Sequence, residues 1–240
     1  MTSTCEILDT DYGPMVVASH DFNQTGALRA TRRGVHHDRM VLLAGLLDAM
    51  PPDRVAVDAG ANLGAFAVPL SAHVGDGGWM HAFEPQPVVF NMLAGSLALT
   101  QRVNVRAHNV CLGDVDGRIE VPQYDYHSPM NYGSIEFGPA QVEPLNQARG
   151  ADPAKVEYVD MRRLDGYGFE RLDLMKIDVQ RMEIPLLTGA AETLRRCRPV
   201  LFVEWIDNDP GTLIRALESH GYRVKSEHVD DWLCVPIENA

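Results

Sequence analysis

One stretch, residues 55–85, constrains the fold more than any other part of the chain. A short apolar run ends at Asp58, a glycine-rich turn follows at residues 60–64 (Gly-Ala-Asn-Leu-Gly), and a second short run ends at Glu84. This order is typical of a βαβ unit, which builds a nucleotide pocket at the carboxyl edge of a parallel sheet. The turn lets the backbone approach a ligand closely, and Glu84 is spaced to accept hydrogen bonds from both hydroxyls of a ribose.

The residues of the turn favour S-adenosylmethionine over a dinucleotide as the ligand. Counting from Gly60, the dinucleotide pattern G-x-G-x-x-G requires a second glycine where this chain has Asn62. That pattern also needs a helix N-terminus that receives a pyrophosphate. Asp58 would repel a pyrophosphate but suits the cationic sulfonium and ammonium of S-adenosylmethionine. A nicotinamide-dependent oxidoreductase stays open as the alternative.

Strand and helix patterns alternate along the rest of the chain. Predicted strands cover residues 54–58, 79–83, 103–107, 119–121, 156–161, 172–179 and 200–204, with a closing hairpin of 222–225 and 232–235. Predicted helices cover residues 35–50, 62–74, 87–100, 183–197 and 212–220. Such alternation predicts an α/β fold with a doubly wound, mainly parallel sheet, whose ligand lies at the carboxyl ends of the strands.

The chain divides into an N-terminal cap and helix, residues 1–53, and a larger domain, residues 54–240. In the cap, residues 15–19 predict a short strand, and the polar segment 24–34 predicts a loop. In the larger domain, residues 124–153 are rich in Pro, Gly, Asn and Gln and show no periodicity. Loops of this length are usually functional, and the aromatic and polar side chains here suit an acceptor lid; a flexible surface loop is the alternative.

Composition narrows the classes of partner. Hydrophobic residues make up 45% and charged residues 22% of the 240 positions, as in soluble globular proteins. The 21 basic and 33 acidic side chains give a net charge of −12, which argues against nucleic-acid binding. The four cysteines form no C-x-x-C pair, which predicts reduced thiols in the cytoplasm and no zinc site. We see no signal peptide or membrane-spanning stretch, and leave open whether the chain forms a homodimer.

Several ordered blocks extend the pattern over about residues 54–206. They are residues 57–64 (Val-Asp-Ala-Gly-Ala-Asn-Leu-Gly), 82–85 (Ala-Phe-Glu-Pro), 112–114 (Leu-Gly-Asp), 172–179 (Leu-Asp-Leu-Met-Lys-Ile-Asp-Val), 182–183 (Met-Glu), 187–190 (Leu-Thr-Gly-Ala) and 198–204 (Arg-Pro-Val-Leu-Phe-Val-Glu). In this order they resemble the FkbM family of S-adenosylmethionine-dependent methyltransferases. The resemblance implies a class I methyltransferase fold with seven strands, the last antiparallel. It also implies methyl transfer, usually to a hydroxyl of a natural product or a sugar.

The resemblance implies a donor site at the strand ends. The positions carried over for S-adenosylmethionine are Asp58, Gly60, Asn62, Gly64, Glu84 and Asn109. The turn lies under the methionine moiety, and Glu84 holds the ribose. Adenine is expected near residues 109–114, where Asn109 or the backbone of Val110 reads its edge.

Methyl transfer to a hydroxyl calls for a general base, because the oxygen loses its proton as the new bond forms. Asp178 is the leading candidate and Glu204 the second, since both end predicted strands at the sheet edge. Lys176 can instead pair with Asp178 as a structural partner, and Asp178 can instead contact the ammonium of the donor. The sequence leaves these roles open. His108 and His127 are further candidates, because histidine titrates near neutral pH.

One position departs from the family pattern. Where that pattern reads Lys-Ile-Asp-Val-Glu-Gly, residues 176–181 read Lys-Ile-Asp-Val-Gln-Arg. If the family glycine has a positive φ, Arg181 strains the turn. If the glycine leaves room, Arg181 projects into the pocket, where its planar fork suits a carboxylate or phosphate. A surface ion pair with a nearby glutamate is an equal alternative, and the change also leaves open a catalytically silent binding protein.

We assign four residues to the acceptor: Gln180, Arg181, His127 and Asn131. A divalent metal is a separate question. Asp178 and Glu204 offer oxygen ligands for Mg²⁺, which would lower the pKa of an acceptor hydroxyl. No third carboxylate stands at a fitting position, because Gln180 replaces the obvious one. We therefore do not expect a metal.

Overall fold

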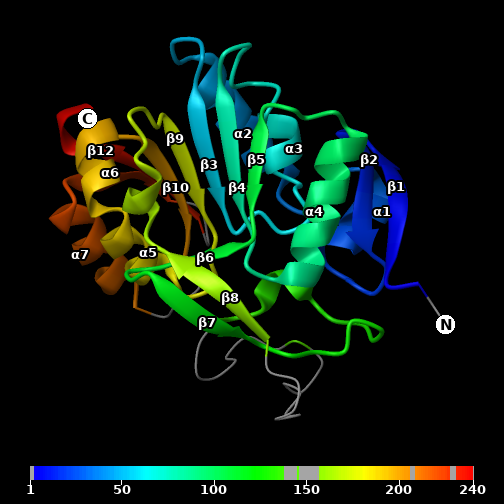
Figure 1. Cartoon of the computed structure of the whole chain (residues 1–240). Coiled ribbons are helices and arrows are strands. Elements are labelled where there is room, and N and C mark those ends of the chain that lie inside the picture. Colours follow the sequence, from blue (N-terminus) through cyan, green and yellow to red (C-terminus); the bar gives the residue numbers. More distant parts are fainter. Residues whose placement is uncertain (1–2, 138–144, 146–156, 206–208, 228–230, 240) are drawn as a thin grey trace.

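A seven-stranded sheet forms the centre of the molecule (Figure 1). The computed structural model describes residues 3–137, 145, 157–205, 209–227 and 231–239. The strands are β3 (Val55–Ala59), β4 (Trp79–Phe83), β5 (Val105–His108), β9 (Leu174–Ile177), β10 (Val200–Glu204), β11 (Tyr222–Glu227) and β12 (Asp231–Pro236), in the order β11-β12-β10-β9-β3-β4-β5. Strands β5, β4, β3, β9 and β10 run parallel, and β12 is antiparallel to both neighbours. The predicted doubly wound sheet with its closing hairpin is confirmed.

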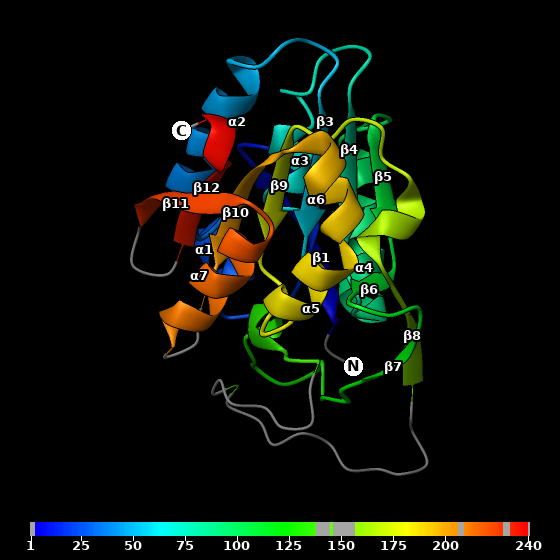
Figure 2. The same ribbon diagram turned by 90° about the vertical axis from the view of Figure 1, so that its left-hand side faces the viewer.

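Helices cover both faces of this sheet. They are α1 (Gln24–Thr31), α2 (His37–Asp48), α3 (Ala67–Leu70), α4 (Pro87–Leu99), α5 (Glu183–Gly189), α6 (Ala191–Cys197) and α7 (Pro210–Ser219). Helices α5, α6 and α7 form one layer, which faces the viewer in Figure 2, and the others lie on the opposite side. None of the helices in the described part of the chain is long and apolar enough to cross a membrane.

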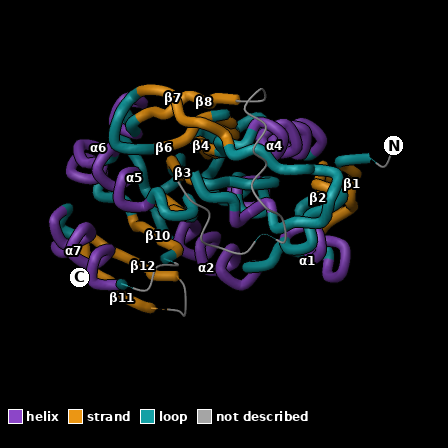
Figure 3. The backbone as a smooth tube through the Cα atoms, turned by 90° about the horizontal axis from the view of Figure 1, so that it is seen from below, coloured by secondary structure: helices purple, strands orange, loops and turns teal. Residues whose placement is uncertain are grey.

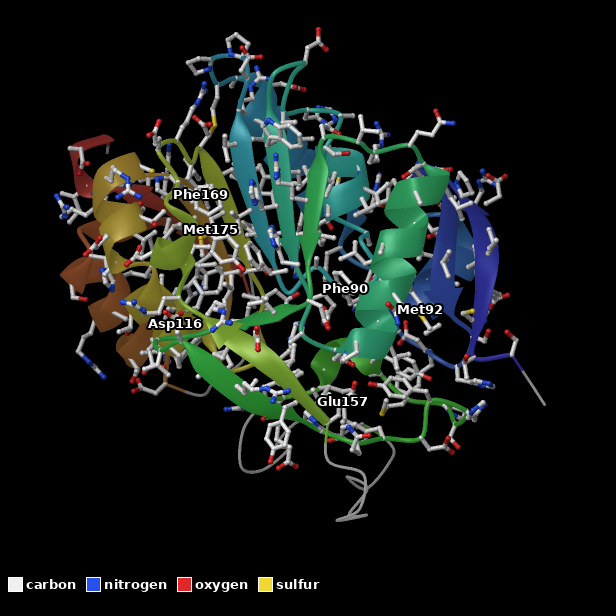
Figure 4. The ribbon with its side chains drawn as sticks, viewed as in Figure 1. Phe90, Met92, Asp116, Glu157, Phe169 and Met175 are labelled. Carbon is white, nitrogen blue, oxygen red and sulfur yellow. The ribbon has the colours of Figure 1, made fainter. Side chains whose placement is uncertain are left out.

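Two apolar cores result, because successive strand residues point to opposite faces. In β3, Ala56 packs into the core shared with α2 and α4, whereas Val57 packs into the core shared with α5 to α7. Figure 4 shows Met92 on the first of these sides and Met175 with Phe169 on the second. Both faces of the central strands are therefore buried, as expected for a parallel sheet.

Two of the predicted helices differ from those in the structure. The helix predicted over residues 62–74 is reduced to α3, because Asn62 (φ 49°) and Gly64 (φ 92°) keep the preceding turn out of helical geometry. The helix predicted over residues 183–197 breaks at Ala190 into α5 and α6. At Gly189, a Cβ would lie 1.9 Å from the carbonyl oxygen of Gly113, so this helix end packs directly on backbone.

The N-terminal cap is more ordered than predicted. Residues 24–34, expected to be a loop, contain α1, and β1 (Cys5–Thr10) pairs with β2 (Gly13–Ala18) in a hairpin. The hairpin attaches to α4 through Ser96, whose hydroxyl accepts a hydrogen bond from the Val16 amide at 3.0 Å. A separate small sheet, of order β6-β8-β7, consists of β6 (Val110–Leu112), β7 (Gly117–Val121) and β8 (Glu157–Arg162).

Gly60 fixes how closely the ends of β3 and β9 approach each other. Its φ is 81°, and its amide donates to the Phe83 carbonyl at 3.0 Å. A Cβ at this position would lie 1.7 Å from the carbonyl oxygen of Asp178. No side chain fits between the two strand ends, so the position requires glycine on both conformational and steric grounds.

We expect Gly60→Ala to reduce the free energy of unfolding by at least about 3 kcal/mol, or to prevent folding, because backbone has to move to remove the clash. The matched control is Gly45→Ala: Gly45 lies exposed in α2 with nothing within 4 Å of a built Cβ. It should gain about 0.5–1 kcal/mol of stability. Urea denaturation of both variants measures the difference, and a Gly60→Ala protein as stable as wild type contradicts the packing argument.

Candidate active site

A cavity of about 1140 Å³, open solvent at its mouth included, lies at the carboxyl ends of β3, β4, β9 and β10. Figure 3 looks onto this edge of the sheet. The strand ends contribute Gly60, Glu84, Lys176, Asp178 and Glu204 to its wall. Residues from β6, from the segment 133–137 and from the N-terminal cap complete the lining. The sheet edge thus forms the floor, and segments outside the sheet form the roof.

A buried ammonium stands at the centre of the floor. Lys176 is 5% exposed, and its Nζ lies 3.2 Å from Asp58 Oδ1 and 3.3 Å from Asp178 Oδ2. Burial opposes its charge, but the carboxyl groups of Asp178, Asp58 and Glu204 outweigh that cost and raise the pKa of Lys176. Burial raises the pKa of Asp58, which lies under the lysine, outside the cavity wall. Lys176 is therefore a fixed counter-ion.

Glu84 presents a buried carboxyl group to the cavity. Its Oε2 accepts a hydrogen bond from the backbone N–H of Asn62 at 2.9 Å, and its Oε1 accepts one from the backbone N–H of Gln86 at 2.8 Å. Burial raises the pKa of Glu84 to about 7, although these two amide donors act in the opposite direction. Asn109 supports the same strand end, because its Nδ2 donates to the carbonyl oxygens of Glu84 and Pro85 at 2.8 and 3.0 Å.

A single amide joins two carboxyl groups at the other end of the floor. Nε2 of Gln180 donates to Asp178 Oδ1 at 2.8 Å and to Glu204 Oε2 at 3.0 Å. Burial acts to raise the pKa of Asp178, but Lys176 and hydrogen bonds from the Glu204 carboxyl group and from Gln180 bring it below its usual value. Burial and the neighbouring Asp178 raise the pKa of Glu204 well above its usual value. The two pKa values move in opposite directions, so Asp178 is the stronger acid of the pair and Glu204 the weaker one.

The turn after β9 has left-handed backbone at two consecutive residues. The φ angles are 50° at Gln180 and 74° at Arg181, so the position of the family glycine is indeed one of positive φ. The Arg181 amide donates to Glu183 Oε1 at 3.1 Å, and its Nε lies 3.3 Å from Oε2 of the buried Glu136. The guanidinium thus pairs with a glutamate of the predicted lid, and Arg181 is not among the described residues that line the cavity.

The structure separates the sequence-predicted residues into two groups. Those that line the cavity are Gly60, Asn62, Glu84, Asp178, Gln180 and Glu204. The described residues outside the lining are Asp58, Gly64, Asn109, Arg181, His127 and Asn131. The sequence analysis offered two residues to contact adenine, Asn109 or the backbone of Val110. Of these two, Val110 lines the cavity and Asn109 does not. Among the residues that the structure describes, no group of three or more His, Cys, Asp or Glu side chains is arranged to hold a metal ion.

The two predicted lid residues have local roles. His127 is exposed, and its amide donates to Asp125 Oδ1 at 3.0 Å in a surface turn. Asn131 caps the short helix Tyr132–Ser134 by accepting from the Gly133 amide at 3.1 Å. It thereby shapes the part of the lid, Gly133 and Ser134, that does line the cavity. Of the predicted lid, residues 138–144 and 146–153 lie outside the described part of the chain.

The N-terminal cap supplies roof residues that the sequence reasoning missed: Asn23, Gln24, Val35 and His36. The buried Asp21 holds this segment in place, because its Oδ2 accepts from the Thr25 amide at 2.7 Å at the start of α1. Its Oδ1 accepts from the Tyr132 amide at 3.4 Å, which ties the cap to the lid. An aspartate ahead of Thr25 is a helix-start signal that the sequence did contain.

The sheet order, the single antiparallel strand and the floor at the carboxyl edge are those of a class I methyltransferase fold. Residues 58–224 match the family model described as the methyltransferase FkbM domain. The chain therefore belongs to the FkbM methyltransferase family. Membership favours methyl transfer over the nicotinamide-dependent oxidoreductase that the turn pattern left open.

Relatives and solved structures agree with this assignment. The 31-O-demethyl-FK506 methyltransferase FkbM of Streptomyces tacrolimicus is 30% identical over 218 residues, which cover 81% of this chain and 82% of the relative. The 2-O-methyltransferase NoeI of Sinorhizobium fredii is 28% identical over 172 residues, covering 66% and 65%. The crystal structure of methyltransferase FkbM from Methylobacillus flagellatus shares the fold, with a TM-score of 0.53 at 16% identity, over 77% of this chain and 43% of that one.

We expect the Arg181–Glu136 pair to stabilise the protein far more than an exposed pair, because Glu136 is buried. A double-mutant cycle with Arg181→Met and Glu136→Gln should give a coupling of about 1–3 kcal/mol in the free energy of unfolding. The control cycle uses the exposed Arg162–Asp160 pair, whose N···O distance is 2.8 Å, with Arg162→Met and Asp160→Asn. That coupling should stay below about 1 kcal/mol. Equal couplings in the two cycles would rule out a structural role for the pair.

Proposed function

We propose that this protein transfers the methyl group of S-adenosylmethionine to a hydroxyl oxygen of a small molecule. The observation that carries the proposal is one cavity with two separate acidic groups, Glu84 at the end of β4 and the Asp178–Glu204 pair at the ends of β9 and β10. Glu84 is suited to accept hydrogen bonds from the ribose hydroxyls of the donor. The Asp178–Glu204 pair is suited to accept the proton that the acceptor hydroxyl loses. Membership in the FkbM family supplies the reaction class.

The residues of the floor fit the donor. Glu84 keeps lone pairs available on both oxygens beyond the two amide bonds that it accepts, which suits a pair of ribose hydroxyls. Asn62 Oδ1 is buried in the cavity wall, with no hydrogen-bond partner among the described residues. The glycine at position 60 keeps the turn free of a side chain beside Asp178. A buried acceptor without a partner is costly, so a bound ligand with a donor group would stabilise this arrangement.

S-adenosylmethionine, when bound, supplies an electrophilic methyl group. The chain itself has to hold the two reactants in line and accept one proton. Asp178 fits the second task, because Lys176 at 3.3 Å keeps it ionised at neutral pH. Glu204 is less suited, because burial and the neighbouring Asp178 raise its pKa well above the usual value and favour its protonated form. We assign the base to Asp178.

The roof supports a neutral, hydroxylated acceptor. The polar side chains of the described roof include Asn23, Gln24, His36 and Ser134, none of which carries a fixed charge. Lys176, the one cationic side chain in the described lining, is already paired with two carboxyl groups. The anionic acceptor first inferred from Arg181 therefore finds no support in the described lining. One relative is named a 2-O-methyltransferase and another a 31-O-demethyl-FK506 methyltransferase, and both names agree with a hydroxyl acceptor.

Donor binding should strengthen as pH rises from 6 to 8. The pKa of Glu84 is about 7 in the free protein, so part of the population is protonated at neutral pH. Two ribose hydroxyls favour the ionised form, so binding releases a proton and is weaker below pH 7. Calorimetry with S-adenosylhomocysteine, in buffers of different ionisation enthalpy, measures both effects.

Glu84→Gln should weaken donor binding by about 1–3 kcal/mol and remove most of this pH dependence. The exposed Glu170 provides the control, and Glu170→Gln should bind as wild type does. Wild-type affinity in Glu84→Gln would disprove the ribose assignment. Tighter binding of NAD than of S-adenosylhomocysteine would disprove the donor itself.

Asp178→Asn should lower turnover by roughly a hundredfold, because an amide cannot accept the proton. Turnover is followed as formation of S-adenosylhomocysteine with a panel of neutral polyhydroxylated acceptors. Calorimetry on the same variant separates the two roles that the sequence left open. Unchanged donor affinity identifies a base, whereas a loss of donor affinity that accounts for the whole effect identifies a partner of the donor ammonium.

A further inference from the structure

We propose that Gln180 is a positioning residue whose amide joins the carboxyl groups of Asp178 and Glu204 into one acid–base pair. The role of that pair in methyl transfer rests on the proposed function, but the pairing itself does not. Neither the family model nor the named relatives assign a role to this glutamine. It stands where the family pattern has a glutamate, so the property would belong to this chain.

The geometry is that of a bridge. One nitrogen, Nε2 of Gln180, lies 2.8 Å from Asp178 Oδ1 and 3.0 Å from Glu204 Oε2. A primary amide has two N–H groups, so it can donate one to each carboxyl group at the same time. A glutamate in this place would have no donor when ionised and would add another negative charge beside Asp178. All three side chains line the cavity.

The backbone that holds this amide is constrained from outside the cavity. Left-handed φ angles at both Gln180 and Arg181 cost free energy for residues other than glycine. The Arg181 amide is held by Glu183 at 3.1 Å, and its guanidinium is held by Glu136. Neither contact involves the Gln180 side chain. The turn is thus fixed on its outer side while the glutamine side chain faces the ends of β9 and β10.

Charged groups face the pair from several elements. Lys176 on β9 lies 3.3 Å from Asp178 Oδ2, and Asp58 lies beyond it on β3. His36, from the segment before α2, lines the same cavity. Asp231 on β12 is in register with Glu204 and pairs with Arg39 of α2. A substitution of Gln180 alone leaves all of these residues unaltered.

The amide acts on the pair in a defined direction. A hydrogen bond donated to an ionised carboxylate favours ionisation and lowers its pKa. Two neighbouring carboxyl groups repel each other when both are charged, and the amide donates to both. Loss of the donors should therefore make the carboxyl groups harder to ionise. The pKa of Asp178 would then be higher, so Asp178 would become ionised, and able to accept a proton, only at a higher pH.

The experiment compares Gln180→Met and Gln180→Glu with wild type. Methionine keeps the length and removes the donors, and glutamate keeps the shape and adds a charge. The matched controls are Gln101→Met and Gln101→Glu, because Gln101 is also left-handed (φ 54°) but is exposed at the end of α4. Circular dichroism and urea denaturation establish that each variant folds.

The readout is the titration of the Asp178 and Glu204 carboxyl ¹³C signals by NMR, assigned with Asp178→Asn and Glu204→Gln. We expect the lower apparent pKa of the pair to rise by about one unit in Gln180→Met and further in Gln180→Glu. Both Gln101 variants should titrate as wild type does. Unchanged titration of both carboxyl groups in a folded Gln180→Met protein overturns the proposal.

Kinetics provide a second readout. The acid limb of the pH profile of kcat/KM should move to higher pH by the same amount in Gln180→Met. An equal loss of activity at every pH, with an unchanged titration, would mean that Gln180 only fills space. If wild type transfers no methyl group to any acceptor, the proposed function fails, and the NMR titration still decides whether Gln180 couples the two carboxyl groups.

Discussion

The close approach of β3 and β9 at their carboxyl ends is the constraint on which the rest of the site depends. Gly60 lets the two backbones meet, and Lys176 then lies between Asp58 and Asp178. Burying one of these charges alone would cost several kcal/mol. Together, the ammonium and the carboxyl groups compensate one another's charge, so the floor of the cavity can be both buried and charged.

This arrangement also divides the two ends of the cavity by chemistry. At one end, Glu84 takes two backbone amides and little compensating positive charge, so its pKa rises to about 7. At the other end, Lys176 helps to lower the pKa of Asp178, whereas burial and the neighbouring Asp178 raise the pKa of Glu204. Carboxyl groups at the carboxyl ends of β4, β9 and β10 thereby acquire different pKa values, which allow them different tasks.

The roof differs from the floor in how it is built, because the floor is the edge of one sheet and the roof is not part of that sheet. It is made of segments far apart in the sequence, the cap before α2 and the lid after β7, and these are tied by Asp21 to each other. Arg181 ties the strained turn after β9 to the same lid through Glu136. Arg181, which stands where the family pattern has a glycine, thus connects the floor of the cavity to its roof. A change of roof would alter the acceptor without disturbing the sheet.

The sequence by itself determined the alternation of strands and helices, the mainly parallel sheet and the acidic residues at the strand ends, because period, glycine turns and strand-end carboxylates are local patterns. For Arg181 it left two alternatives open, a positive φ or a side chain that projects into the pocket, and the structure shows the positive φ. Only the tertiary structure decided that α1 exists, that Arg181 turns to Glu136, and that Asn23, Gln24 and His36 face the cavity. These depend on contacts between distant segments, which leave no periodic signal. The same holds for the Gln180 bridge: its two acceptors belong to different strands, and only their parallel alignment brings them within reach of one amide.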